Sequence, residues 1–203
     1  MTAAPWRRRL VIFAKAPRLG RVKTRLGRDI GHVRAWRFYR RMLFSLAGRL
    51  GRDPRWETLI ACAPDTALTD GRQWPAGIPR FAQGPGDLGD RMQRAFDQLP
   101  PGPVVIIGAD IPGIGADDIW DAFRALADHG AVFGPADDGG YWLVGQKRSP
   151  RILRLFDGVR WSGPHALADT VGNLEKTPYA ALKSLTDVDN GADFRRLFGK
   201  NSY

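Results

Sequence analysis

Residues 104–110 read Val-Val-Ile-Ile-Gly-Ala-Asp, a short apolar run that ends in a carboxylate. Apolar residues without polar alternation are typical of a strand that is buried on both faces, as in a parallel sheet covered by helices. Pro112 follows two residues later and forces the chain to turn. The run therefore predicts a buried strand, with Asp110 at the carboxyl edge of the sheet, where open α/β sheets bind ligands.

The same kind of run recurs along the chain and alternates with helical patterns, which is typical of βαβ units and a mostly parallel central sheet flanked by helices. We expect strands at residues 10–14, 58–62, 104–108, 131–134, 141–145 and 181–185. We expect helices at residues 33–50, 88–99, 116–128, 164–174 and 192–198. No internal repeat, low-complexity block or linker divides the sequence, so residues 1–203 are expected to form one α/β domain.

Composition narrows the class of protein. The chain has 203 residues, of which 43% are hydrophobic and 26% charged, as in globular proteins. No apolar run approaches the roughly 18 residues of a membrane span, and the stretch 10–14 is too short for a signal-peptide core. A single cysteine, Cys62, excludes an intrachain disulfide framework and a multi-cysteine zinc site. We therefore expect a cytoplasmic protein.

The formal net charge of +10 is unevenly distributed along the chain. Residues 1–55 carry 16 basic and 2 acidic side chains, whereas the remaining residues carry an acidic excess. A basic segment of this kind is compatible with nucleic acid, with anionic lipid, with a small phosphorylated ligand, or with a solvated basic surface. The arginines of helix 33–50 lie mostly opposite its apolar face, which favours a solvated face for them.

The loop after the first expected strand, residues 15–25, contains five cations and no carboxylate. Such a loop, leading into a helix, can offer backbone N–H groups and cationic side chains to a phosphate. Lys23 and Arg25 are the favoured direct ligands, since arginine suits bidentate phosphate contacts. The spacing of Gly20 and Lys23 does not match a P-loop.

Residues 84–89 form the pattern Gly-x-Gly-x-x-Gly, which is weak evidence for a dinucleotide site. Pro85 removes one N–H group from the loop, and Asp87 places a negative charge where pyrophosphate would approach. The pattern therefore favours a turn and a helix start, with Asp87 as the cap and Arg91 near the ligand edge.

Asp110 is suited to Mg²⁺ or Mn²⁺, which usually takes one or two protein carboxylates together with phosphate and water. Two other strand ends could supply a second carboxylate. One is the block 134–141, where Asp138 is either functional or part of a tight turn, and its unusual Asp-Asp-Gly-Gly sequence favours function. The other is the block 185–190, where Asp189 is either a ligand or a cap of the last helix.

Four blocks in combination resemble one family. They are residues 13–17 with 20–26, Gly-Ala-Asp110-Ile-Pro, the block 134–141, and Asp187-Val-Asp189. Together they resemble the glycosyltransferase-A-like, nucleotide-diphospho-sugar-transferase superfamily, and within it the bacterial rSAM/selenodomain-associated transferase group. The matching blocks extend over nearly the whole chain.

The resemblance implies a Rossmann-like domain in which the first loop holds a nucleotide and Mg²⁺ or Mn²⁺ lies between Asp110 and Asp189. Lys15, Lys23 and Arg25 would contact phosphates. The nucleotide site as a whole would comprise Lys15, Ala16, Pro17, Gly20, Lys23, Thr24, Arg25, Gly89, Arg91, Gly139 and Gly140.

These expectations combine into a metal-dependent transferase that uses a nucleotide-sugar or a nucleoside triphosphate, with glycosyl transfer slightly preferred over nucleotidyl transfer. Lys23 and Arg25 would neutralise charge on the leaving group, and Asp138 would orient or deprotonate a small-molecule acceptor. We expect no nucleic-acid partner on this interpretation. The alternative is a basic nucleic-acid-binding α/β module without catalysis.

Overall fold

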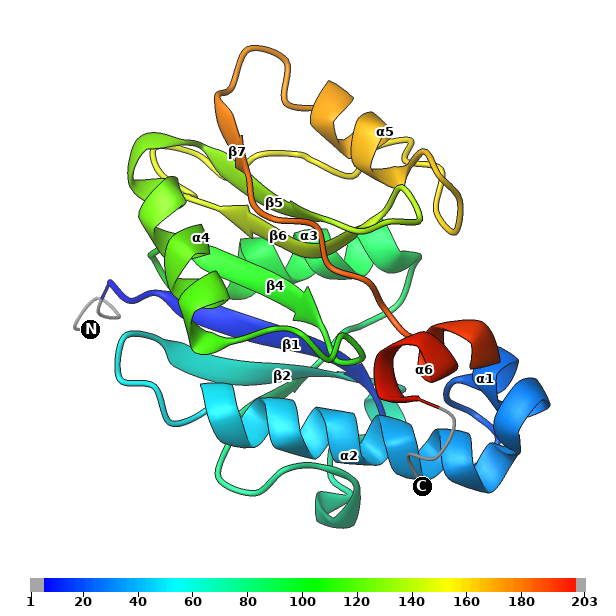
Figure 1. Ribbon diagram of the computed structural model, residues 1–203. Helices are drawn as coiled ribbons and strands as arrows, with labels where there is room; N and C mark the ends of the chain where they lie inside the picture. Colours follow the sequence, from blue (N-terminus) through cyan, green and yellow to red (C-terminus); the bar gives the residue numbers. More distant parts are fainter. Residues whose placement is uncertain (1–5, 200–203) are drawn as a thin grey trace.

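A computed structural model describes residues 6–199 of the chain. Its strands form one seven-stranded sheet in the order β3-β2-β1-β4-β6-β5-β7 (Figure 1). The strands are β1 (Arg9–Lys15), β2 (Glu57–Ala63), β3 (Arg80–Ala82), β4 (Val104–Gly108), β5 (Ala131–Pro135), β6 (Tyr141–Gln146) and β7 (Tyr179–Ala181). β6 runs antiparallel to β4 and β5, and all other pairs are parallel, so the predicted mostly parallel sheet is confirmed.

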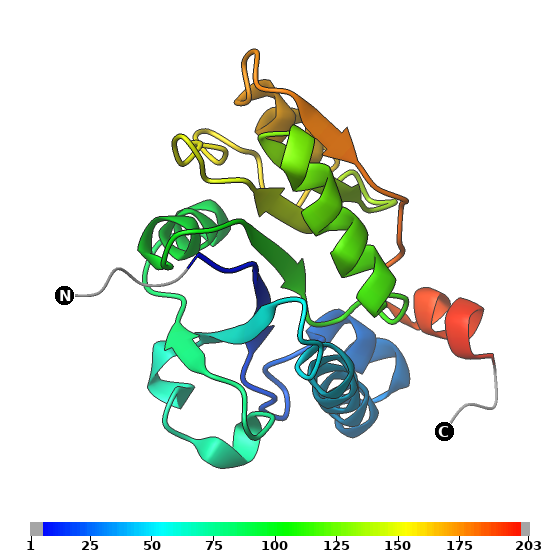
Figure 2. The ribbon, with the colours of Figure 1, turned by 90° about the vertical axis from the view of Figure 1, so that its left-hand side faces the viewer.

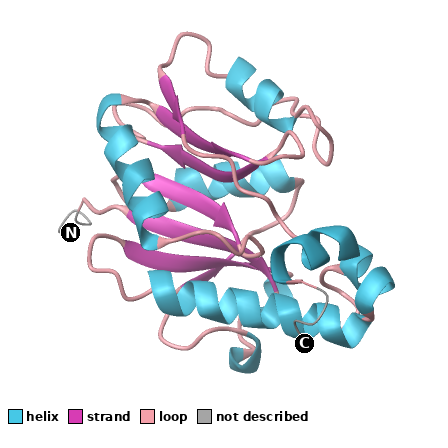
Figure 3. Cartoon of the chain, viewed as in Figure 1, coloured by secondary structure: helices cyan, strands magenta, loops and turns pink. Residues whose placement is uncertain are grey.

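Helices cover both faces of this sheet (Figures 1 and 3). They are α1 (Thr24–Ile30), α2 (His32–Leu50), α3 (Leu88–Gln98), α4 (Ala116–Asp128), α5 (Ala166–Gly172) and α6 (Gly191–Phe198). Two 3-10 turns, η1 (Asp65–Ala67) and η2 (Gly71–Gln73), lie between β2 and β3. α2 and α4 pack on one face, whereas α3 and α5 pack on the other; Figure 2 shows α3 and α4 on opposite sides of the sheet.

The side chains of β1 show how one strand serves both layers, because successive residues of a strand point to opposite faces. Leu10 and Ile12 belong to the core under α2 and α4. Val11 is fully buried in the core under α3 and α5, and Phe13 packs against that core. The apolar character of the strand on both faces thus follows from the two helical layers.

α6 brings the end of the described chain back to the first loop. Phe194 of α6 packs in a third apolar cluster with Leu26 of α1 and Ala35 of α2. The backbone N–H of Gly191 donates to the Asp29 carboxylate at 2.7 Å. In Figure 1, α6 accordingly lies beside α1, which places the segment before α6 at the carboxyl end of β1.

Three sequence predictions differ from the structure. The strand expected at 181–185 is instead β7, which ends at Ala181. Beyond it the N–H groups of Leu182 and Leu185 still donate to β5, but the carbonyl of Lys183 accepts the indole N–H of Trp142. The helix expected at 164–174 spans only Ala166–Gly172. α1 and β3 were not predicted, since α1 begins within the cation-rich segment 15–25 and β3 has three residues directly after Pro79.

None of the helices within residues 6–199 is both long enough and apolar enough to span a membrane.

Candidate functional site

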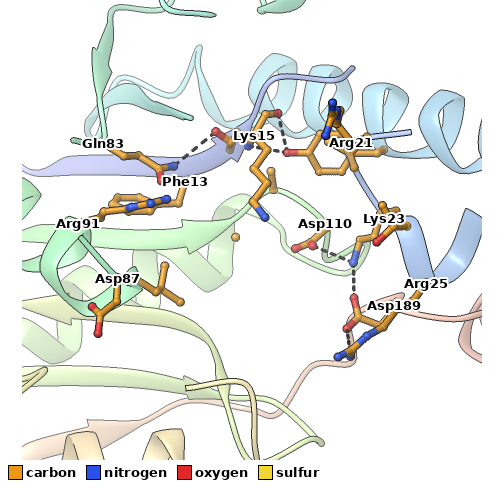
Figure 4. A pocket seen from close by; sticks show the side chains of 17 residues that line it. Phe13, Lys15, Arg21, Lys23, Arg25, Gln83, Asp87, Arg91, Asp110 and Asp189 are labelled. Carbon is orange, nitrogen blue, oxygen red and sulfur yellow. Dashed lines mark hydrogen bonds and ion pairs between the residues drawn. The ribbon is translucent and has the colours of Figure 1, made fainter. Parts of the chain in front are cut away.

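A cavity of about 500 Å³ opens at the carboxyl ends of β1 and β4 (Figure 4). The loop after β1 forms one wall, and the start of α3 forms another. The described residues that line it are Phe13, Ala14, Lys15, Arg21, Val22, Lys23, Thr24, Arg25, Tyr39, Gln83, Asp87, Leu88, Arg91, Gly108, Ala109, Asp110 and Asp189. The location agrees with the general rule that open α/β sheets bind ligands at this edge.

Two aromatic side chains of α2 hold the first loop in place. The hydroxyl of Tyr39 accepts from the backbone N–H of Lys15 at 2.9 Å and donates to its carbonyl at 3.0 Å. The indole N–H of Trp36 donates to the carbonyl of Pro17. Burial raises the pKa of Tyr39, so this phenol stays neutral and keeps its proton for the carbonyl. The position of Lys15 is therefore fixed by the helix behind it.

Four backbone N–H groups of the loop are engaged by the protein itself. Those of Ala16, Arg18 and Arg21 donate to the carbonyls of Ala63, Ala16 and Arg18, respectively. With Lys15 bonded to the Tyr39 hydroxyl, four N–H groups have protein acceptors. These four N–H groups are therefore not available to a phosphate.

Lys23 lies at the centre of the charged part of the cavity. Its Nζ is 2.8 Å from Oδ2 of Asp110 and 2.6 Å from Oδ1 of Asp189 (Figure 4). The side chain is only 6% exposed. Burial acts to lower the pKa of Lys23, but the two carboxylates outweigh it and raise that pKa. Lys23 is therefore charged and held by both acids.

Asp189 comes from the segment before α6 and carries a second cation. Oδ2 of Asp189 is 3.8 Å from the guanidinium of Arg25, whose side chain is 76% exposed at the rim. Burial acts to raise the pKa of Asp189, whereas Lys23 and Arg25 lower it to a net value below the usual range. The proposed pair of metal ligands, Asp110 and Asp189, is thus brought together across the cavity, with both acids bound to Lys23.

Three other cations line the cavity without a carboxylate partner among the described residues. They are Lys15 at the end of β1, Arg21 in the loop and Arg91 on α3. The Nε of Arg91 donates to the carbonyl of Gly86 at 2.9 Å, which orients its guanidinium. Unpaired cations beside a cavity are groups that can bind an anionic ligand.

The turn between β5 and β6 lies near the cavity but does not line it. Oδ1 of Asp138 accepts from the N–H of Gly140 at 2.9 Å, as in a tight turn. Burial, followed by the charges of Asp189, Asp110 and Asp138, raises the pKa of Asp187 to about 6. Asp138 and Asp187 therefore belong to the same acidic surroundings as the two proposed metal ligands.

The structure brings together part of the predicted site. Seven of the predicted residues line the cavity: Lys15, Lys23, Thr24, Arg25, Arg91, Asp110 and Asp189. Seven others are not among its described lining residues: Ala16, Pro17, Gly20, Gly89, Asp138, Gly139 and Gly140. Gly89 instead permits close packing, because a Cβ there would lie 2.8 Å from both Phe156 and Trp161.

Sequence reasoning missed several lining residues. Tyr39 was assigned to the core stripe of its helix, and its hydroxyl gave no separate signal. Gln83 follows the short strand β3; its side-chain amide donates to the carbonyls of Ala61 at 2.9 Å and Ala14 at 3.4 Å. Arg21 lies in the loop 15–25, which contains no acid, and this absence could have identified it as a candidate phosphate ligand.

The two carboxylates fit a divalent cation in the usual two-carboxylate manner. Within residues 6–199, no three His, Cys, Asp or Glu side chains converge as a metal-binding group. Oxygen atoms of Asp110 and Asp189 nevertheless converge on one point, since both contact Nζ of Lys23. Mg²⁺ typically takes one or two carboxylates and completes its shell with substrate phosphates and water. The donor set suits a cation that arrives with a phosphate ligand.

Comparison with known proteins places the chain in a family. Residues 46–163 match the family described as "Uncharacterized protein conserved in bacteria (DUF2064)". The chain belongs to this family. Among curated proteins, no match to the sequence was found.

A solved structure of a "putative nucleotide-diphospho-sugar transferase" from Desulfovibrio desulfuricans G20 is similar to almost the whole of this chain. The two share 30% sequence identity with a TM-score of 0.87, covering 98% of this chain and 90% of that chain. The predicted resemblance to the nucleotide-diphospho-sugar-transferase superfamily and its Rossmann-like fold is thereby confirmed.

Two more distant structures share only the fold. A CMP:2-keto-3-deoxy-manno-octonic acid synthetase complexed with CTP is 12% identical, with a TM-score of 0.57, and covers 94% of this chain and 96% of its own. Glucosyl-3-phosphoglycerate synthase from Mycobacterium tuberculosis, in complex with Mn²⁺, UDP and glucosyl-3-phosphoglycerate, is 9% identical, with a TM-score of 0.59. It covers 97% of this chain and 77% of its own.

Proposed function

We propose that this DUF2064 family member is a metal-dependent transferase, acting as one domain over residues 1–203, whose donor is a nucleotide-sugar. A nucleoside triphosphate is the second donor class. The observation that carries the proposal is one cavity in which Lys15, Arg21 and Arg91 have no carboxylate partner within residues 6–199 while Asp110 and Asp189 converge on one point. Cations for phosphate and carboxylates for metal are thus placed together.

In this proposal Lys15, Arg21 and Arg91 bind the phosphates of the donor. Asp110 and Asp189 would hold Mg²⁺ or Mn²⁺, which supplies Lewis-acid stabilisation of phosphate charge. Lys23 and Arg25 stabilise the negative charge on the leaving phosphate, and Asp138 orients or deprotonates the acceptor hydroxyl.

The choice between the two donor classes follows the more similar relative. The Desulfovibrio desulfuricans protein is described as a nucleotide-diphospho-sugar transferase, and it is the relative at 30% identity. One of the two distant structures contains CTP and the other contains UDP, so together they favour neither donor class. We therefore propose glycosyl transfer ahead of nucleotidyl transfer.

A thermal-shift panel tests the proposal. Nucleoside triphosphates and nucleotide-sugars of each base are added with Mg²⁺, with Mn²⁺ and with EDTA, since binding to the native state raises the melting temperature. We expect a metal-dependent shift with at least one donor. Product analysis on that donor then separates glycosyl transfer, which releases a nucleoside diphosphate, from nucleotidyl transfer, which releases pyrophosphate.

No shift with any donor would overturn the proposal. Binding of oligonucleotides that persists in EDTA and weakens steeply with salt would replace it with the nucleic-acid-binding alternative.

A further inference from the structure

The position between Asp110 and Asp189 is taken by a cation of the protein itself. Nζ of Lys23 lies 2.8 Å from one carboxylate and 2.6 Å from the other. We propose that Lys23 is the resident counter-ion of this pair and competes with the divalent metal for it, so that metal binds tightly only when a phosphate engages Lys23. This inference rests on the proposed function, because it assigns the two acids to a metal.

The two cations exclude each other on electrostatic grounds. Mg²⁺ binds carboxylate oxygens at about 2.1 Å, so a metal on the two oxygens that now contact Lys23 would lie less than about 5 Å from Nζ. Charges of +1 and +2 at that distance repel, and the repulsion is strong where water is scarce. The side chain of Lys23 is 6% exposed, so little water is available to screen it.

While no phosphate is bound, burial and backbone conformation keep Lys23 between the two acids. A buried ammonium group needs anionic partners, and Asp110 and Asp189 form ion pairs with it. Its backbone adopts φ 45° at the start of α1, a left-handed conformation that fixes where its side chain enters the cavity. Arg25 does not lie between the two acids. Its guanidinium is 3.8 Å from Oδ2 of Asp189, and its side chain is 76% exposed.

A phosphate in the cavity changes this balance, because it offers Lys23 an anion other than the two carboxylates. The carboxylates are then freed for the metal, and the metal in turn neutralises the same phosphate. Such coupling is reciprocal, so metal tightens phosphate binding by the factor by which phosphate tightens metal binding. Lys23 thus favours donor binding and opposes metal binding in the absence of the donor.

Replacing Lys23 by a neutral residue should weaken donor binding but tighten metal binding in the absence of the donor, which makes the inference testable. Mn²⁺ alone is titrated into the full chain without nucleotide, and free Mn²⁺ is followed by its electron paramagnetic resonance signal. Lys23→Met and Lys23→Gln remove the ammonium group, whereas Lys23→Arg keeps the charge. Lys15→Met is the matched control, because it removes one positive charge from the same cavity without touching either carboxylate.

We expect Lys23→Met and Lys23→Gln to bind Mn²⁺ at least about 10-fold more tightly than the wild type. Lys15→Met should change the affinity by less than about 3-fold, and Lys23→Arg should remain as weak as the wild type. Thermal melts confirm that each variant is folded. Neutral variants that bind Mn²⁺ no more tightly than Lys15→Met would overturn the inference.

The wild type is measured with the donor panel in parallel, which separates the two possible failures. A wild type that binds a donor with metal, combined with no tightening in the Lys23 variants, overturns the competition alone. A wild type that binds no donor overturns the proposed function, whatever the Mn²⁺ affinities of the variants.

Discussion

The cavity contains two kinds of cation. Lys23 and Arg25 are paired with acids: Lys23 contacts both Asp110 and Asp189, and Arg25 contacts Asp189. Lys15, Arg21 and Arg91 line the same cavity without a carboxylate partner among the described residues. The sequence does not distinguish the two groups, because four of the five cations lie in one short loop.

The position of each cation within the loop therefore decides how readily it can bind a phosphate. A cation without a partner can bind phosphate directly and contributes its full attraction. A cation already bound to a carboxylate must first give up that contact, and the net gain is smaller. Lys15 and Arg25 are therefore expected to differ in their effect on donor binding, although both are cations of the same loop.

The largest effect is expected at Asp110, which the proposal makes a metal ligand. In the presence of Mn²⁺, Asp110→Asn should weaken donor binding about 30- to 100-fold, because the amide removes one charge from the metal site. Isothermal titration calorimetry measures the affinity. Asp121→Asn is the control, since Asp121 is an exposed acid of α4 that pairs with Arg124. Equal affinities of Asp110→Asn and Asp121→Asn would contradict the assignment.

The next effect distinguishes the two kinds of cation directly. Lys15→Met should weaken donor binding about 10-fold, which corresponds to the loss of about 1.4 kcal/mol. Arg25→Met removes the same charge from the rim and should weaken binding less than about 3-fold, because that side chain is 76% exposed and already near Asp189. Titration of both variants under one salt concentration tests this order, and a larger effect at Arg25 would reverse the comparison.

The hydrogen bonds between Tyr39 of α2 and the backbone of Lys15 give a prediction on stability. Tyr39→Phe removes the hydroxyl that bonds both the N–H and the carbonyl of Lys15. The free energy of unfolding should fall by about 1–3 kcal/mol, because the backbone groups lose their partner. Urea denaturation measures this change. Tyr179→Phe, at a residue that is 44% exposed, should change stability far less, and equal losses would show that the Tyr39 hydroxyl has no such role.

Much of the fold could be predicted from residue patterns. The apolar runs of β1, β2 and β4 gave these strands to within a residue or two, and the boundaries of β4 and α4 were predicted correctly. The antiparallel direction of β6 was not predicted, although the six residues between the expected strands 131–134 and 141–145 are too few for a parallel crossover. β3 lacks a hydrophobic pattern of sufficient length.

The candidate site was predicted less completely, for a physical reason. Lys23 and Asp189 are separated by 166 positions in the sequence, and their contact depends on how α6 packs beside α1. The residue types indicated phosphate and metal chemistry, but they did not show that one lysine would lie between both acids. Similarly, the apolar stripe of α2 concealed the polar contact that Tyr39 makes with Lys15.

The smallest effect is expected at Cys62, which lies in the buried sheet rather than in the open cavity. Cys62 of β2 lies opposite Ala14 of β1 and is fully buried. Burial raises the pKa of the Cys62 thiol to about 12, so thiolate is scarce at pH 8. Iodoacetamide should therefore label the native protein slowly, with no rise in rate near pH 8–9, whereas the urea-unfolded protein shows that rise. A native rate that follows the unfolded profile would show that the sheet is open to solvent.

The most direct test of the central claim is the affinity of the wild-type chain for its best donor, measured by calorimetry with Mn²⁺ and again with EDTA. We predict that Mn²⁺ tightens donor binding at least about 10-fold, because Asp110 and Asp189 would hold the metal while Lys23 contacts the donor. Equal affinity with and without metal would contradict it.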